Sequence, residues 1–175
     1  MKSKSNVVTI RIIVYVHRLK LKQLLDHTNL FKQYNDYFIK NQLTAIIIEA
    51  DNSLEFDEEK IIYESISKNI ICDEPHNSYP FDHFVLNCLS GRQNKKRIIR
   101  NGKVPYLLSG CVGILLHEPC AMCSMALLHS RIDAVIYFRR NNFAGALGSK
   151  CYLHSMNSLN HHFPVYLVDN ELQND

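Results

Sequence analysis

A strand, a helix and a second strand follow one another closely between residues 112 and 138. The runs Val112 to Leu116 and Ala134 to Phe138 are almost wholly apolar, as in buried strands. Between them, Pro119 suits the first turn of a helix, and Ala121 to Leu128 are strong helix formers. A strand, a helix and a strand in close succession favour helices packed on a central sheet. The segment therefore predicts an α/β fold.

The earlier half of the chain has a similar alternation of elements. Val7 to Val16 is rich in β-branched residues and predicts a strand. Leu19 to Asn41 has apolar residues at helical spacing, and Thr44 to Glu49 is typical of a buried strand. A further helix is expected to begin near Asp82. Together these elements predict a three-layer α/β/α sandwich around a central mixed sheet.

The composition fits a single globular domain. The chain has 175 residues, of which 46% are hydrophobic, and only 6 Gly and 5 Pro, which excludes linker and low-complexity proteins. We expect residues 1–42 to form a short basic N-terminal segment of strand plus helix, and residues 43–175 to form the main domain.

The N-terminal apolar stretch does not predict a membrane segment or a signal peptide. It is interrupted by Arg11 and is shorter than the roughly 20 residues of a membrane helix. Basic residues follow it instead of a small-residue cleavage site. We therefore expect a protein of the cytoplasm or nucleus, with no membrane partner. In those reducing compartments the six cysteines would be buried thiols or metal ligands.

Charge is unevenly distributed along the chain. Residues 1–45 carry a net charge of +6, residues 46–90 of −8 and residues 91–175 of +5. One basic run is a candidate for phosphate contact, with a solvated loop as the alternative. Its cations are Arg92, Lys95, Lys96, Arg97, Arg100 and Lys103.

Two cysteines at the start of the predicted helix are candidate metal ligands. Cys120 and Cys123 are three residues apart, so their sulfurs lie on one face, and the helix dipole favours the thiolates that zinc requires. A lone pair of this kind is also compatible with a redox dithiol or with coincidence. No second such pair exists, so zinc would need a histidine. His83 is the best candidate because it opens a predicted helix, and the three residues would leave a fourth position open.

These motifs resemble those of a known family. Zinc nucleoside and nucleobase deaminases combine an H-x-E helix start with a downstream P-C-x-x-C helix start. The run from Glu118 to Ile132, the segment Gly145 to Ser149 and Leu159-Asn160-His161 look like the tRNA-specific adenosine deaminases. The resemblance implies a cytidine-deaminase-like zinc-binding domain over residues 43–175, with zinc at His83, Cys120 and Cys123.

Within that family the chain is most similar to the non-catalytic subunit of the eukaryotic heterodimer that converts wobble adenosine to inosine. Val85 stands where the catalytic Glu belongs, and an isopropyl group cannot move protons. Rescue by Asp82, Glu118 or Glu74 is not expected. The resemblance implies a subunit inactive alone, with a catalytic H-x-E-containing deaminase subunit and tRNA as partners. A self-sufficient deaminase with a displaced proton carrier and a zinc-stabilised RNA-binding scaffold stay open as alternatives.

Other residues carry weaker expectations. Phe143 and Tyr152 are expected in the core, with base stacking on RNA as the alternative, and Gly145 is expected to permit a tight turn. The fourth zinc ligand would be water, or a carboxylate of the tail, Glu171 or Asp175. The basic run of residues 92–103 is our candidate for tRNA contact.

Overall fold

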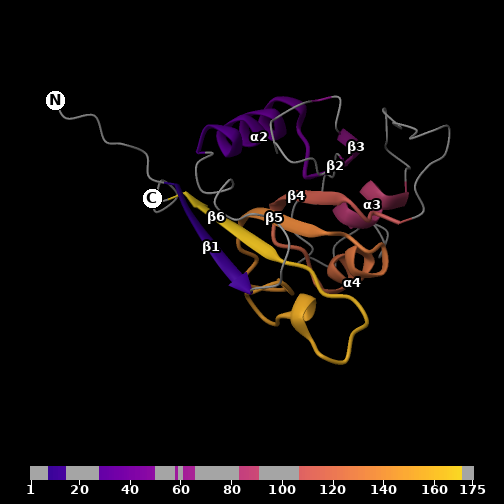
Figure 1. Cartoon of the computed structure of the whole chain (residues 1–175). Helices are drawn as coiled ribbons and strands as arrows, with labels where there is room; N and C mark the ends of the chain where they lie inside the picture. Colours follow the sequence, from indigo (N-terminus) through magenta and orange to yellow (C-terminus); the bar gives the residue numbers. More distant parts are fainter. Residues whose placement is uncertain are drawn as a thin grey trace.

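The computed structural model describes residues 8–14, 28–49, 58, 61–65, 83–90 and 107–170. These residues form a six-stranded sheet with helices against both of its faces (Figure 1). The elements, in chain order, are β1 (Val8–Val14), α2 (Thr28–Asn41), β2 (Ala45–Glu49), β3 (Ile61–Ser65), α3 (Phe84–Ser90), β4 (Cys111–His117), α4 (Ala121–His129), β5 (Ala134–Arg139), η2 (Leu153–Ser155) and β6 (Val165–Asn170).

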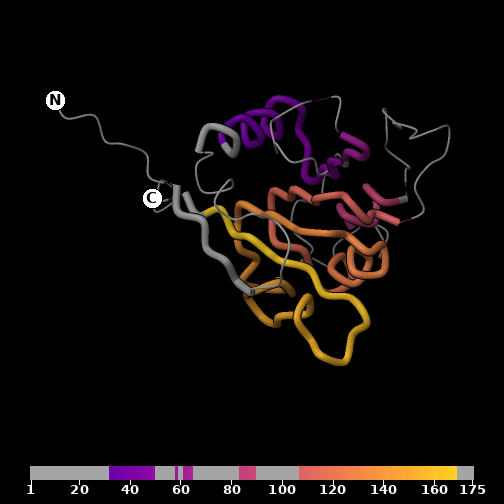
Figure 2. The backbone as a smooth tube through the Cα atoms, viewed as in Figure 1, coloured from indigo at the N-terminus to yellow at the C-terminus, as the bar shows by residue number. Residues whose placement is uncertain are grey.

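The sheet is mixed, with strand order β1-β6-β5-β4-β2-β3. Its central strands β4, β5 and β6 are parallel, with Val112 opposite Ala134 and Val135 opposite Val165. The outer strands β2, β3 and β1 pair antiparallel. The backbone trace in Figure 2 shows β4 returning to the sheet as β5 by way of α4. This confirms the two strands and the intervening helix predicted between residues 112 and 138.

Both faces of the sheet are apolar, because successive residues of a strand point to opposite sides. On one face, residues such as Ile47 and Tyr137 pack with α3 and α4. On the other, Ile46 and Ile136 pack with Phe38 of α2. The sheet is therefore covered on both sides, and the predicted α/β/α sandwich with a mixed sheet is confirmed.

The starts of α3 and α4 differ in detail from the sequence-based expectation. The carbonyl of His83 accepts the first hydrogen bond of α3, from the Asn87 N–H at 2.8 Å, so His83 is its N-cap residue. Cys120 is the N-cap of α4. Pro119 consequently precedes the helix, and its expected place in the first turn is wrong.

The N-terminal elements belong to the same layers. β1 pairs with β6 at one edge of the sheet, and α2 covers one of its faces. Phe38 of α2 meets Phe138 of β5 edge to face, with ring centroids 6.1 Å apart. Within the described residues, no helix is long and apolar enough to span a membrane.

Candidate metal centre

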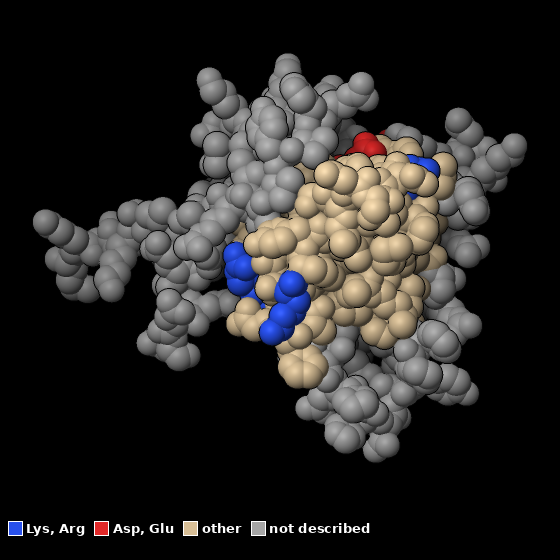
Figure 3. All heavy atoms as spheres, turned by 90° about the horizontal axis from the view of Figure 1, so that it is seen from below, with Lys and Arg blue, Asp and Glu red and all other residues tan. Residues whose placement is uncertain are grey.

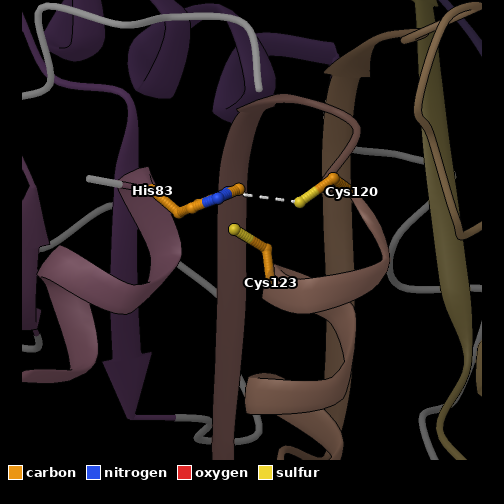
Figure 4. A group of neighbouring side chains, drawn as sticks. All are labelled: His83, Cys120 and Cys123. Carbon is orange, nitrogen blue, oxygen red and sulfur yellow. Dashed lines mark hydrogen bonds between the residues drawn. The ribbon is translucent and has the colours of Figure 1, made fainter. Parts of the chain in front are cut away.

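Three of the residues predicted as metal ligands lie together at one site. The ligand atoms of His83, Cys120 and Cys123 are all within 4.8 Å of one another. Sγ of Cys120 is 3.3 Å from Nδ1 of His83. Figure 4 shows the imidazole and both sulfurs pointing toward a common point between α3 and α4. The structure thus brings together residues that are 37 positions apart in the sequence.

Helix starts hold these side chains in place. His83 and Cys120 are the N-cap residues of α3 and α4, and Cys123 lies in the first turn of α4. The N–H of Ser124 donates to the Cys120 carbonyl at 2.8 Å, which fixes that turn. Cys120 and Cys123 are buried and His83 is half-buried, so the site is close to the surface on the histidine side.

The donor set fits a zinc ion. Zinc favours tetrahedral coordination by imidazole nitrogen at about 2.0 Å and thiolate sulfur at about 2.3 Å. Ligand atoms around such an ion lie about 3 to 4 Å from one another, which is close to the spacing of this cluster. The adjacent N-terminus of α4 favours the negative charge of thiolates. The three residues therefore form a candidate metal centre, and their ligation of zinc stays a prediction.

Val85 is an apolar member of the same buried region. It is 1% exposed, on the first turn of α3, and belongs to the core cluster that contains Cys120 and Cys123. Within the described part of the chain, the metal-ligand cluster includes no Asp or Glu. Among the described residues, the cluster therefore offers ligand atoms for a metal but contains no carboxylate that could transfer protons.

Among the described residues, Glu118 is a carboxylate only two positions before Cys120 in the sequence, and it has a different task. It is fully buried, and its Oε1 accepts hydrogen bonds from the N–H groups of Leu147 at 3.0 Å and Ser149 at 2.9 Å. Its Oε2 accepts from the Asn141 N–H at 3.2 Å and from the Ser149 hydroxyl. All the acceptor capacity of this carboxylate is directed at one loop, which confirms that Glu118 is structural.

The loop held by Glu118 supports the cysteine end of the site. Ala146 N–H donates to the Pro119 carbonyl at 2.9 Å, and Gly145 forms an isolated β-bridge with Cys120. A Cβ added to Gly145 would lie closer than 3.0 Å to the Glu118 carboxylate and the Asn141 carbonyl. Gly145 is therefore needed for this close approach, and it also closes a turn, since its N–H donates to the Asn141 carbonyl at 2.9 Å.

Two aromatic residues were expected in the core, and that expectation is wrong. Phe143 is 71% exposed and Tyr152 is 51% exposed. Asn141 holds the turn before Phe143, since its Oδ1 accepts the N–H groups of Phe143 and Ala144 at 3.0 and 2.9 Å. Two consecutive asparagines with a glycine three residues further on are the sequence signal that could have placed Phe143 on a loop.

Several predicted residues lie outside the described part of the chain. They include the two candidate tail ligands, Glu171 and Asp175, and two of the carboxylates considered as substitutes, Asp82 and Glu74. The basic run of residues 92–103 lies outside it as well. Its members are Arg92, Lys95, Lys96, Arg97, Arg100 and Lys103.

Fold and site together define an α/β sandwich protein with a His/Cys/Cys centre of the kind found in zinc deaminases. Part of the chain is similar in sequence to TAD3 proteins. It is 50% identical over 64 residues to the Arabidopsis thaliana "tRNA-specific adenosine deaminase TAD3", covering 37% of this chain and 16% of that protein. It is 37% identical over 95 residues to the Schizosaccharomyces pombe "tRNA-specific adenosine deaminase subunit tad3", covering 50% and 29%.

A third relative has a name that denies activity. The Danio rerio "Probable inactive tRNA-specific adenosine deaminase-like protein 3" is 32% identical over 115 residues, covering 54% of this chain and 34% of that protein. These relatives confirm the resemblance to the tRNA-specific adenosine deaminases. The match spans about a third or less of each relative's length.

Two other comparisons add little. No protein-family model matches the chain. A chain from a structural study of A-to-I editing by tRNA:A34 deaminases superposes with a TM-score of 0.49 at 16% identity, covering 81% of this chain and 98% of that chain. Similarity at this level says nothing about the chemistry of the site.

Proposed function

We propose that this chain is a non-catalytic, zinc-binding subunit of a tRNA-specific adenosine deaminase that converts wobble adenosine to inosine. It dimerises with an H-x-E-containing catalytic subunit and helps to bind tRNA, in the cytoplasm or nucleus. One observation carries the proposal. The ligand set of His83, Cys120 and Cys123 is intact, whereas the residue two positions after the histidine is the buried Val85.

The chemistry of adenosine deamination explains why this combination matters. In the deaminases that this site resembles, zinc activates a water and a glutamate moves its protons. His83, Cys120 and Cys123 would hold the zinc ion in this chain. Val85 has no group that can accept or donate a proton, and losing such assistance lowers a rate by about 10² to 10⁴-fold. The buried Glu118 cannot replace it, because its oxygens are engaged by Asn141, Leu147 and Ser149.

Co-expression tests the proposal directly. The chain is purified alone and together with an H-x-E-containing relative from the same organism, and zinc content and inosine formation on tRNA are measured. We expect zinc in the chain alone, inosine only from the pair, and a complex of the two chains. Ammonia release by the chain alone would contradict the proposal, and so would the failure of the two chains to co-purify.

Matched cysteine variants connect the cluster to the metal. Cys123→Ser should lower zinc content sharply, because Cys123 is a member of the cluster. Cys151→Ser is the control, since Cys151 is half-buried and its thiol donates to the Ala146 carbonyl at 3.6 Å, which a serine hydroxyl can also do. Equal zinc content in the two variants would show that the cluster does not bind the metal.

A further inference from the structure

The segment between β5 and β6 presents exposed aromatic and basic side chains together. Arg139, Arg140, Phe143, Lys150 and Tyr152 are all exposed, and we call this set the aromatic-basic surface. Phe143 is 71% and Tyr152 51% exposed, so both rings offer apolar area that a ligand could cover. The surface can therefore offer apolar and charged contacts to one partner.

Backbone contacts hold the members of this surface in one compact unit. Leu147 and Tyr152 form a β-bridge, and the Lys150 N–H donates to the Gly145 carbonyl at 2.9 Å. The Oδ1 of Asn141 accepts the N–H groups of Phe143 and Ala144, and the Gly145 N–H donates to the Asn141 carbonyl at 2.9 Å. The Glu118 carboxylate accepts hydrogen bonds from the backbone of the same segment, at Asn141, Leu147 and Ser149. Because the loop is ordered in advance, a ligand loses little free energy in organising it.

The charge of the segment favours an anionic partner. Between Asp133 and Asp169 the sequence contains Arg139, Arg140 and Lys150 and no Asp or Glu. Apart from Met156, the other exposed residues of this segment have polar side chains. In Figure 3 two groups of Lys and Arg atoms lie at the lower left of the face seen from below, and another lies at the upper right, near the Asp and Glu atoms at the upper edge.

Aromatic rings among cations match one class of ligand best. Proteins that bind single-stranded nucleic acid stack unpaired bases on exposed aromatic rings and hold the phosphates with Lys or Arg. An acidic peptide would use the cations and leave Phe143 in water. An apolar protein surface would use Phe143 and bury the three cations without partners, which is costly.

We propose that the aromatic-basic surface binds single-stranded RNA, with Phe143 stacking on an unpaired base and Arg139, Arg140 and Lys150 contacting the phosphates on either side. The choice of tRNA as the source of that single strand rests on the proposed function. The surface itself follows from the exposed residues of this chain. It adjoins the metal centre through the pairing of Gly145 with Cys120, so RNA bound here would lie beside that centre.

Binding of short oligonucleotides to the purified full chain tests the proposal. The probes are a fluorescent heptaribonucleotide and the same strand in a fully paired duplex. Phe143→Ala should weaken binding of the single strand about tenfold, since stacking on one base contributes roughly 1 to 3 kcal/mol. Phe143→Trp should preserve it. Because Phe143 is largely exposed, truncating it should not unfold the protein, and thermal unfolding checks this.

The basic residues have a separate signature in the salt dependence. The triple variant Arg139→Glu, Arg140→Glu, Lys150→Glu should reduce the slope of log K against log salt by about 2, because single strands give about 0.7 per phosphate contact. The controls lie on α2, across the sheet. Ile39→Ala removes another exposed apolar side chain, 65% exposed, and Lys40→Glu reverses an exposed charge.

Each outcome bears on the proposal. A loss tenfold greater for Phe143→Ala than for Ile39→Ala supports it, and equal effects of the two would overturn it. Unchanged RNA binding together with weaker co-purification of a deaminase subunit would also overturn it, because the surface would then contact protein. The failure of inosine formation would count against the proposed function alone, since oligonucleotide binding by this chain is measured without any catalytic subunit.

Discussion

Glu118 and Val85 flank the same cluster of ligands, and the two positions have opposite chemistry. Glu118 is a fully buried carboxylate whose oxygens are engaged by the loop of residues 141–149. Val85 is equally buried and has no polar atom in its side chain. The chain has an acid that holds the loop beside the centre and an aliphatic residue on the first turn of α3. Under the proposed function, the position of Val85 is the one where proton transfer would require an acid.

The largest expected effect comes from removing the structural acid. Glu118→Ala leaves the N–H groups of Asn141, Leu147 and Ser149 without their acceptor, and each unpaired buried donor costs about 1 to 3 kcal/mol. We expect the free energy of unfolding to fall by about 4 kcal/mol, measured by denaturant titration. Glu58→Gln, at an exposed position, is the control and should change it by less than about 0.5 kcal/mol. Similar losses of unfolding free energy in Glu118→Ala and Glu58→Gln would show that Glu118 does not have the structural role described here.

A second buried polar side chain, His154, contrasts with Glu118 because it lacks hydrogen bonds to the part of the chain that the structure describes. His154 is fully buried, and neither ring nitrogen has a partner among the described residues. Burial, aided by the charge of His162, lowers the pKa of His154 to about 4. The unfolded chain takes up this proton near pH 6.5 and the folded chain near pH 4, so stability falls as the pH is lowered through this window.

The expected loss from His154 is about 3 kcal/mol between pH 6.5 and pH 4. Denaturant titrations at several pH values measure it. His154→Leu should flatten the dependence over that window, whereas Ser158→Ala, at an exposed position without a titrating group, should leave it unchanged. An equally steep dependence in His154→Leu would show that another group titrates.

Gly145 tests how closely Glu118 must approach its loop. Gly145→Ala places a methyl group against the Glu118 carboxylate and the Asn141 carbonyl, and overpacking of this kind costs about 2 kcal/mol. Gly113→Ala is the matched control, because its nearest neighbour would be at an ordinary 3.8 Å. Thermal unfolding of both variants measures the difference, and equal melting temperatures would contradict the packing described here.

The smallest expected effect is at the aliphatic position. Val85→Ala removes two methyl groups from the core and should lower the free energy of unfolding by about 1.5 kcal/mol. Zinc content should be unchanged, because Val85 offers no ligand atom. A loss of zinc in Val85→Ala, measured by metal analysis against Cys123→Ser, would mean that this side chain also shapes the metal centre.

The sequence predicted the central strands and the ligand cluster because both depend on local pattern. β2, β4 and β5 begin or end within one residue of the predicted runs, since each is a short apolar segment between polar residues. The pairing of Cys120 with Cys123 follows from helical spacing. His83 could be inferred because it stands at a helix start and because the family motif places a histidine there.

The loop around Glu118 could not be predicted in the same way. Its hydrogen bonds join residues that are 23 to 31 positions apart, and no local pattern encodes them. Phe143 and Tyr152 were misjudged for a related reason. Hydrophobicity alone predicts burial, whereas the exposure of a ring depends on where the Glu118-bound backbone directs the chain.

The origin of the ligands on two separate helices has a consequence for folding. An ion bound to His83 and the two cysteines would join α3 to α4 and close a long stretch of chain into a ring. Such a cross-link lowers the conformational entropy of the unfolded chain and couples folding to the concentration of free metal ion. Under the proposed function, in which Val85 replaces the proton-transfer group, the metal would still have a structural role, because it would hold α3 and α4 together.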